Sequence, residues 1–267
     1  MAILNAMVPS VGRLFAEWRK TRRLSQLALA SDAAISARHL SFIETGRSTP
    51  SRDMVLRLAS VLEVPLRERN TLLVAAGFAP EYVESQLDAP ELAAVGNALD
   101  AILRQQEPYP AVVMNRHWDI IRANTAARRF FAHLRGDVAD EDSRPNVLRM
   151  MLHPDAVRPY IANWFEVAET LVRRVHRECV GGVVDPGLRA LLDEILAYPG
   201  VPDAWRKPDV GALLPFVPVS FVKAERRFDF FSTVTTLGTP QDITVQEIRI
   251  ECFFPANAAT AEAARAL

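Results

Sequence analysis

The segment 23-RLSQLALASDAAISARHLSFIETGRSTPS-51 decides how the first part of the chain folds. It contains two short apolar stretches, and each is preceded by a serine, Ser25 or Ser36, whose hydroxyl oxygen is suited to cap a helix N-terminus. Gly46 follows the second stretch, where a glycine commonly ends a helix. The pattern predicts two short helices joined by a tight turn, with the second helix over residues 36–45.

The flanking sequence extends this pattern to a compact set of five helices. Before the segment, apolar residues recur at helical spacing. After it, Ser51 opens a fourth helix, and Pro65 begins a fifth that ends at Gly77. The inward positions of the first and fourth helices are predicted to be Val11, Leu14, Phe15, Trp18, Met54, Leu58, Val61 and Leu62.

Residues 77–92 contain two prolines and little strand or core pattern, which predicts a boundary between a domain over 1–80 and a domain over 90–267. The charge also changes there. Residues 1–80 hold 11 Lys+Arg and 6 Asp+Glu, giving +5, and the remaining 20 and 26 give −6, for the net charge of −1. A basic first domain favours a polyanionic partner for that domain alone.

Composition narrows the class of protein. With 49% hydrophobic and 24% charged residues, the chain of 267 residues is typical of a globular protein that buries a large core. We find no apolar run long enough to span a membrane and expect no membrane partner. The first residues lack a positive charge before their apolar run, so we interpret them as a short arm rather than a signal peptide. Cys179 and Cys252 lie far apart, which favours a reducing, cytoplasmic setting.

The second domain mixes strands and helices. Ala111–Met114 and Trp118–Ala123 are apolar and β-branched and predict a hairpin, after which Asn124 is suited to cap a helix over Thr125–Leu134. Other helices are predicted over 90–106, 155–179 and 187–197, and other strands over 214–222, 227–238 and 244–254.

The last predicted strand has the clearest alternation. Ile248, Ile250, Cys252 and Phe254 alternate with charged residues, which predicts one buried face. A hairpin, helices and then three consecutive strands imply an antiparallel sheet with segregated helices. The predicted fold is therefore an all-α first domain plus an α+β second domain.

The predicted helix over 36–45 has two different faces. On a helical wheel, Leu40 and Ile43 share the inward side, whereas Arg38, Phe42 and Thr45 lie opposite and Ser41 lies at the flank. An arginine forms two hydrogen bonds with guanine in the major groove, and an apolar group contacts the thymine methyl. A solvated amphipathic helix explains the arginine but explains Phe42 poorly, although packing of Phe42 on a neighbouring domain is an alternative.

A phosphate contact is predicted for Gln26 at the start of the preceding helix, where a helix N-terminus attracts an anion. Arg47, just beyond the second helix, is predicted to contact the DNA backbone as well. The predicted DNA-binding residues are Gln26, Ser36, Ala37, Arg38, Ser41, Phe42, Thr45 and Arg47.

Residues 11–76 resemble an Xre-type (phage-repressor-like) helix-turn-helix domain, in LSQLALA, Ile35-Ser36, ARHLSFIETGR and Pro50-Ser51. The resemblance implies that the partner is a double-stranded DNA operator. This family usually has a glycine where Ala34 stands, so Ala34 must adopt the conformation that a glycine would take. The family also tends to pair an arginine of the first helix with the glutamate that ends the recognition helix, and Arg19 and Glu44 are therefore predicted to meet.

The segments PYPAVVMNRHWDIIRANTAARRFF and TTLGTPQDITVQEIRIECFFPAN look like an MmyB-like ligand-binding domain with a PAS-like sheet. That resemblance implies a cavity between sheet and helices for a small, largely apolar molecule such as a fatty acid, and a transcription regulator as the whole. Because one helix-turn-helix unit reads few base pairs, we also expect a homodimer.

Ligand-contacting residues are harder to choose. Arg122, His153 or Arg173 are candidate anchors for a carboxylate, although each also suits a solvated face. The predicted ligand-binding residues are Arg122, Asn124, His153, Trp164 and Phe230. Two alternatives stay open, since the aromatic residues suit an ordinary core and the domain suits a protein-interaction module without a metabolite.

No catalytic pattern stands out. His176 and Cys179 share one face of a predicted helix, but no further metal ligands lie near them in sequence. The motifs HExxH, GxSxG and GxxxxGK[ST] are absent. We therefore expect no enzymatic activity, no metal and no cofactor other than a bound fatty acid or similar apolar ligand.

Overall fold

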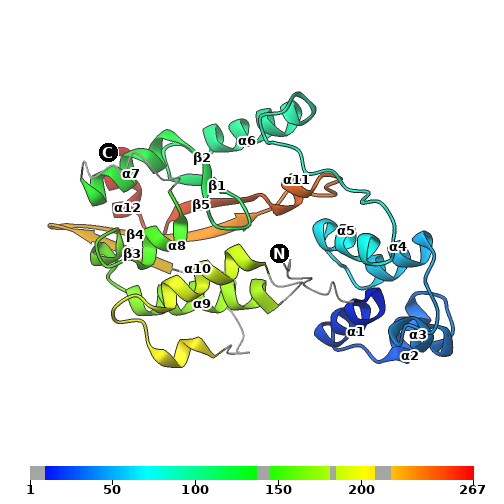
Figure 1. Ribbon diagram of the computed structural model, residues 1–267. Coiled ribbons are helices and arrows are strands. Elements are labelled where there is room, and N and C mark those ends of the chain that lie inside the picture. The colour runs from blue at the N-terminus through cyan, green and yellow to red at the C-terminus, as the bar shows by residue number, and fades with distance from the viewer. Residues whose placement is uncertain (1–9, 137–144, 181–184, 208–217) are drawn as a thin grey trace, which may run out of the picture. The chain divides into compact units, whose positions relative to one another are not determined.

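The computed structural model describes residues 10–136, 145–180, 185–207 and 218–267 (Figure 1). The arm predicted at the chain start and residues 214–217 of one predicted strand lie outside these ranges. The described residues divide into two units. The first runs to Glu84 and includes Val180 and Pro240–Gln246, and the second holds the rest of residues 85–267 that the ranges cover.

The first unit is helical, as predicted. Three serines, Ser25, Ser36 and Ser51, each accept a hydrogen bond from a backbone N–H three residues further on, which satisfies one free donor at each helix start. The helices are α1 (Val11–Thr21), α2 (Gln26–Asp32), α3 (Ala37–Glu44), α4 (Arg52–Val61) and α5 (Leu66–Ala75).

The core of the first unit lies between these helices. Leu40 and Ile43 of α3 are almost fully buried, and so is Val55 of α4, which the sequence pattern missed. Gly12 allows α1 to approach α3 closely, because a Cβ atom there would lie 2.1 Å from the carbonyl oxygen of Ile43. The inner face of the predicted recognition helix is therefore held by direct contact with α1.

A distant segment completes the first unit. Pro65 precedes α5 but offers no side-chain cap, and the side-chain oxygen of Gln246 instead accepts a hydrogen bond from the backbone N–H of Leu66 at 2.7 Å. The backbone of Asp242 pairs with Val83, and the N–H of Ile243 donates to the carbonyl oxygen of Val83. Residues between β4 and β5 of the sheet described below thus belong to the helical unit.

The turn between α2 and α3 requires a left-handed residue. Ala34 has a φ of 53°, the conformation that a glycine would adopt without strain. Its N–H still donates to the carbonyl oxygen of Ser31, and the N–H of Ile35 donates to that of Ala30. The expectation that Ala34 accepts the glycine conformation is confirmed.

We predict that Ala34→Gly stabilises the protein by about 0.5–1 kcal/mol, because relief of left-handed strain exceeds the added chain entropy of glycine. Ala28→Gly, inside α2, is the matched control and is expected to cost about 1 kcal/mol. Urea unfolding measures both free energies. Loss of stability in both variants would show that the turn is not strained.

The second unit contains one five-stranded antiparallel sheet, which confirms the predicted α+β fold. The strand order is β2-β1-β5-β4-β3, so the first hairpin lies beside the last strand of the chain. The strands are β1 (Ala111–Met114), β2 (Ile120–Ala123), β3 (Pro218–Lys223), β4 (Arg226–Thr235) and β5 (Arg249–Pro255).

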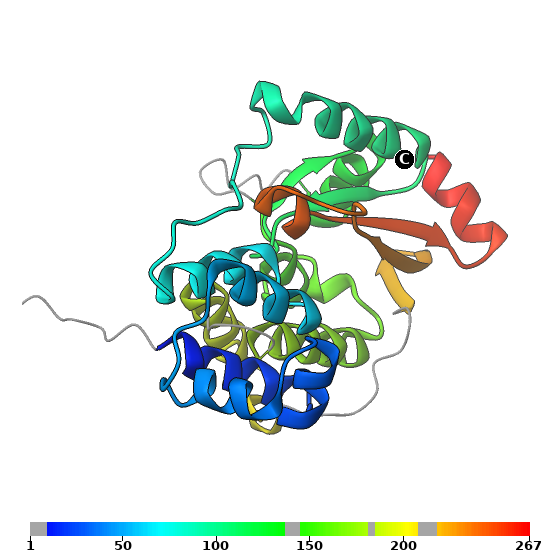
Figure 2. The ribbon, with the colours of Figure 1, turned by 90° about the vertical axis from the view of Figure 1, so that its right-hand side faces the viewer.

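Both faces of this sheet are covered. In β1, Val112 and Met114 belong to a core with the later helices, whereas Ala111 and Val113 pack with α6. Figures 1 and 2 show α6 on one face and α9 and α10 on the other. The helices of this unit are α6 (Ala93–Gln105), α7 (Thr125–Arg135), α8 (Val147–Leu152), α9 (Trp164–Val180), α10 (Pro186–Leu196) and α12 (Ala258–Arg265), with short 3₁₀ turns at Pro90–Leu92, Arg158–Tyr160 and Asp203–Arg206.

The strand predicted over 244–254 is wrong at its start, and the burial predicted for its last residues is partly wrong. Ile243–Glu247 form a short helix, α11, because the Asp242 carboxylate accepts the N–H groups of Thr244 and Val245 and so caps a helical turn. At the other end Phe253 is buried and Phe254 is half-buried, since β5 packs on both faces rather than one.

Two other boundaries also differ from the prediction. The helix expected over 155–179 begins only at Trp164, because Pro159 lacks the N–H that a helix interior needs and the chain forms a 3₁₀ turn there. Trp118 lies in the hairpin loop with a φ of 67° rather than in β2.

Candidate functional sites

The outward face of α3 is open to solvent within its unit. Arg38 and Thr45 are exposed and Phe42 is half-buried, whereas Leu40 and Ile43 on the opposite side are no more than 1% exposed. The predicted two-faced character of this helix is therefore confirmed, and the arginine and the ring are available to a partner.

One carboxylate joins the first three helices. Glu44, the last residue of α3, accepts hydrogen bonds from Arg19 Nε at 2.7 Å and Nη2 at 2.9 Å, which confirms the predicted pair. Gln26 of α2 donates to the same carboxylate at 2.7 Å. The side chains of Arg19 and Glu44 are only 13% and 6% exposed. We call this group the Glu44 clamp; it consists of Arg19, Gln26 and Glu44.

The clamp keeps Glu44 ionised. Burial by itself would raise the pKa of this carboxyl, but the hydrogen bonds from Arg19 and Gln26 and the positive charge of Arg19 and Lys20 lower the pKa below its ordinary value of 4.5. A lowered pKa in the folded state means that ionised Glu44 stabilises folding. This stabilisation is complete above the unfolded-state pKa and is lost as the pH falls through the folded-state value.

We predict that Glu44→Gln lowers the free energy of unfolding by about 2–3 kcal/mol at neutral pH, because the buried guanidinium of Arg19 loses its charged partner. The difference between wild type and variant should shrink below about pH 4. Chemical unfolding at several pH values measures it. Glu17→Gln is the control, since its pair with Arg13 is exposed and is worth within about 0.5 kcal/mol. Equal losses in the two variants would contradict the clamp.

The other predicted DNA-binding residues lie in or next to α2 and α3. Ser36 caps α3 with its hydroxyl, and Ala37 is the first helical residue. The Thr45 hydroxyl donates to the carbonyl oxygen of Ser41 at 2.7 Å. Gln26 begins α2, and its side-chain amide donates to Glu44 in the clamp. The sequence pattern did not predict this hydrogen bond. The DNA contacts of these residues stay predictions.

Three of the predicted residues meet on the surface. The guanidinium carbon of Arg38 lies 5.3 Å from the centre of the Phe42 ring, and that of Arg47 lies 5.9 Å from it. Sequence reasoning chose all three residues but missed that they touch. The signal was present, because residues four apart on a helix are neighbours.

In the second unit, two of the five predicted ligand-binding residues hold structural positions near α6. Arg122 donates to the carbonyl oxygen of Gly96 and to Asp100, both at 2.9 Å. Asn124 caps α7, and its side-chain oxygen also accepts the N–H of Ala111. Both polar groups thus already have protein partners.

The other three predicted residues lie elsewhere in the unit. His153 follows α8, with its ring centre 5.1 Å from that of Tyr198. Trp164 begins α9 and donates to the carbonyl oxygen of Met151 at 3.2 Å, whereas Phe230 is buried in β4. The structure therefore places the five residues in three parts of the unit, and their contact with a ligand stays a prediction. Arg173, the further candidate anchor, donates to Glu169 at 2.8 Å.

Aromatic rings fill the middle of the larger core. The ring of Phe130 lies edge-on to three rings of β3 and β4, with centre-to-centre distances of 5.1 Å to Phe221, 5.3 Å to Phe228 and 5.4 Å to Phe230. All four side chains are at most 2% exposed. Edge-to-face contacts of this kind stabilise a core beyond the area they bury. An apolar ligand that enters this region has to displace rings.

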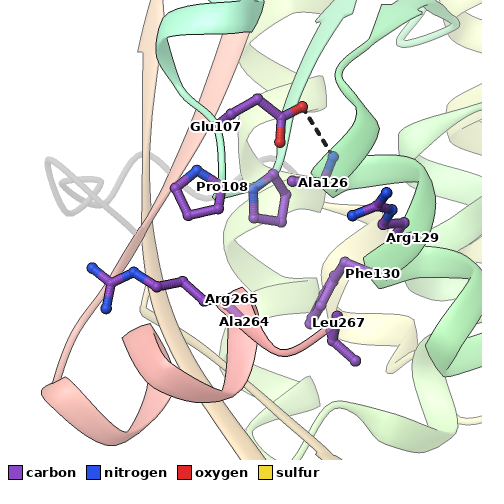
Figure 3. Close-up of a pocket in the computed structure, with 9 residues that line it drawn as sticks. Glu107, Pro108, Ala126, Arg129, Phe130, Ala264, Arg265 and Leu267 are labelled. Atoms are coloured by element: carbon purple, nitrogen blue, oxygen red, sulfur yellow. Dashed lines mark hydrogen bonds between the residues drawn. The ribbon is translucent and has the colours of Figure 1, made fainter.

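A small pocket opens beside this ring cluster (Figure 3). Its volume of about 40 Å³ accommodates a few water molecules. The Glu107 carboxylate points to the first turn of α7 and accepts the N–H groups of Thr125 and Ala126. Arg129 and Arg265 also line the pocket, and Phe130 forms part of its wall. Of the five predicted ligand-binding residues, none lines this pocket.

A second, more open pocket includes one of the five predicted residues, Asn124. Arg104 and Arg128 line it together with Asp100 and Glu107. Both signs of charge are therefore present around it, which distinguishes it from the apolar cavity that the family resemblance implies.

The pair His176 and Cys179 is accounted for by packing. The Nε2 atom of His176 lies 2.7 Å from the carbonyl oxygen of Trp205, and burial raises the pKa of the Cys179 thiol. Within the four described ranges, no three His, Cys, Asp or Glu side chains are grouped to hold a metal ion. Nor does any described helix combine the length and apolar character needed to cross a membrane.

Comparison with known families defines the class of protein. Residues 10–72 match a helix-turn-helix domain, and residues 95–267 match the MmyB-like transcription regulator ligand binding domain. Because the second match covers more than half of the chain, the chain belongs to the MmyB-like family. It is a transcription regulator with a DNA-binding helix-turn-helix domain followed by a ligand-binding domain.

The chain is also weakly similar to a solved structure. A solved structure titled "Structure of an RNA-binding Light-Oxygen-Voltage Receptor" is 13% identical, with a TM-score of 0.26. The match covers 96% of this chain, which spans 60% of the length of that chain. Similarity at this level supports no conclusion about fold or activity. No curated protein matches the chain.

Proposed function

We propose that this regulator binds a specific operator as a homodimer through α3, and that a small, largely apolar, fatty-acid-like molecule in the second domain changes its affinity for DNA. The observation that carries the first half is the exposed face of α3, where Arg38, Phe42 and Arg47 meet on a helix held by the Glu44 clamp. The charge of +5 over residues 1–80 supports a polyanionic partner.

We assign a different role to each arginine. Arg38 lies in the first turn of α3, on its outward face, and reads guanine in the major groove. Arg47 follows the helix end and contacts phosphate, which positions the protein without selecting sequence. A dimer presents two such helices, and its operator consists of two half-sites about 34–36 Å apart.

We predict that Arg38→Ala weakens binding to the operator by about 1–3 kcal/mol and relaxes selection at one base pair. Arg47→Ala is the matched control and is expected to weaken all sequences about equally, as is Gln26→Ala. Fluorescence anisotropy on selected and random DNA measures both effects. Unchanged binding of Arg38→Ala to both DNAs would show that another face of the protein meets the operator.

We infer the response to an apolar ligand from the family match and the aromatic core. A ligand changes DNA affinity only if it binds two states of the protein differently. Because Phe130 and its neighbouring rings fill the core, a long acyl chain is expected to bind a state in which those rings have moved. The ligand is bound and not transformed, so we assign no catalytic activity.

We predict that native mass spectrometry of gently purified protein detects a bound apolar molecule, and that a long-chain carboxylic acid changes operator affinity. A short-chain acid of the same charge is the control. If neither measurement shows an apolar ligand, the second domain is better explained as a dimerisation or protein-interaction module.

We also propose that the protein acts in the cytoplasm, together with its operator DNA. Cys179 and Cys252 are buried, unpaired thiols, which agrees with a reducing compartment.

A further inference from the structure

The end of α3 has a defined backbone geometry. The N–H of Arg47 donates to the carbonyl oxygen of Phe42 at 2.8 Å, and that of Gly46 donates to Ile43 at 3.1 Å. Gly46 has a φ of 75°. These two hydrogen bonds around a left-handed glycine form a Schellman motif, in which the residue after the glycine contacts the residue at the start of the last turn. Here that contact joins Arg47 to Phe42.

A second arginine, one helical turn before Phe42, also contacts its ring. Arg38 lies four residues earlier, so its side chain reaches the same ring, and the two guanidinium carbons lie 5.3 and 5.9 Å from the ring centre. Both arginines are exposed, and among the described residues neither forms an ion pair. The aromatic ring is thus the shared contact of two cations that have no carboxylate partner in the part of the chain that the structure describes.

We infer that Phe42 is a positioning residue whose ring orients Arg38 and Arg47 toward DNA, so that selection of the base pair read by Arg38 depends on Phe42. The inference rests on the proposed function of α3. A free arginine side chain loses rotamer freedom when it binds, and stacking on a fixed ring removes part of that cost beforehand. The ring itself is held because Phe42 is half-buried on a helix fixed by the Glu44 clamp.

This role differs from direct reading of thymine by Phe42. In direct reading, the ring contacts the 5-methyl group of thymine, and removal of that methyl weakens binding. In the positioning role, the guanine contact of Arg38 depends on the ring and the thymine methyl does not matter. Two modified bases separate these roles, because 7-deazaguanine lacks the N7 acceptor and deoxyuridine lacks the methyl group.

The experiment uses the full chain and a selected operator. Fluorescence anisotropy gives the affinity for the operator and for the same operator with 7-deazaguanine at the position sensitive to Arg38→Ala. The variants are Phe42→Leu, which keeps apolar volume but has no aromatic face, and Phe42→Tyr, which keeps the face. Phe42→Met provides a second non-aromatic side chain, and thermal unfolding checks that each variant is folded.

We expect Phe42→Leu and Phe42→Met to reduce the discrimination between the two operators about fivefold. Phe42→Tyr should retain it, and in an Arg38→Ala background Phe42→Leu should cause no further loss of discrimination. Deoxyuridine in place of each thymine should leave wild-type affinity unchanged.

The inference is overturned if Arg38→Ala abolishes the discrimination while Phe42→Leu retains it, or if deoxyuridine weakens the wild type but not Phe42→Leu. Failure of the proposed function of α3 would give a different result from failure of the positioning role. If Arg38→Ala, Phe42→Leu and Arg47→Ala all bind the operator with wild-type affinity, α3 does not contact the DNA. The positioning role of Phe42 is then also wrong.

Discussion

The outward face of α3 depends on the hydrogen bonds that the Glu44 carboxylate accepts. This carboxylate lies almost buried at the end of α3 and receives hydrogen bonds from Arg19 of α1 and Gln26 of α2. A buried carboxylate without such partners is costly, so the three helices are held in the one arrangement that satisfies it. Gly12 makes this possible because its missing side chain lets α1 lie against the backbone of α3. With the inner face fixed in this way, the outer face of α3 presents Arg38 and Phe42 to solvent.

The second unit is held together differently from the first. Its sheet has helices on both faces, and the polar side chain of Asn124 joins the start of α7 to β1 and to the carbonyl oxygen of Tyr109. The ring of Phe130 lies at the centre of the aromatic cluster. A core packed in this way has few stable arrangements rather than a continuous range. Binding of an apolar molecule among these rings would therefore favour a distinct second packing, which is the property that a sensor requires.

Sequence alone predicted much of the first unit because its signals are local. The serines that cap α2 and α3 and the family pairing of Arg19 with Glu44 both appear in the structure. The second unit was predicted less well, because its side chains meet partners far away in sequence. The alternation in β5 indicated one buried face, yet α6 and the opposite core bury Cys252 and Phe253 on two faces. Arg122, predicted as a ligand anchor, already pairs with Asp100, which lies 22 positions away in sequence.

Guanine methylation at N7 gives the most direct measurement of whether the outward face of α3 meets base edges in the major groove. The full chain is bound to a selected operator in which guanines have been methylated sparsely, and bound and free DNA are compared. If Arg38 reads guanine, methylation at one guanine in each half-site excludes DNA from the bound fraction for wild type, and this exclusion disappears for Arg38→Ala. Tight, sequence-specific binding that tolerates methylation at every guanine, or an exclusion pattern that Arg38→Ala leaves unchanged, would contradict a major-groove role for this face.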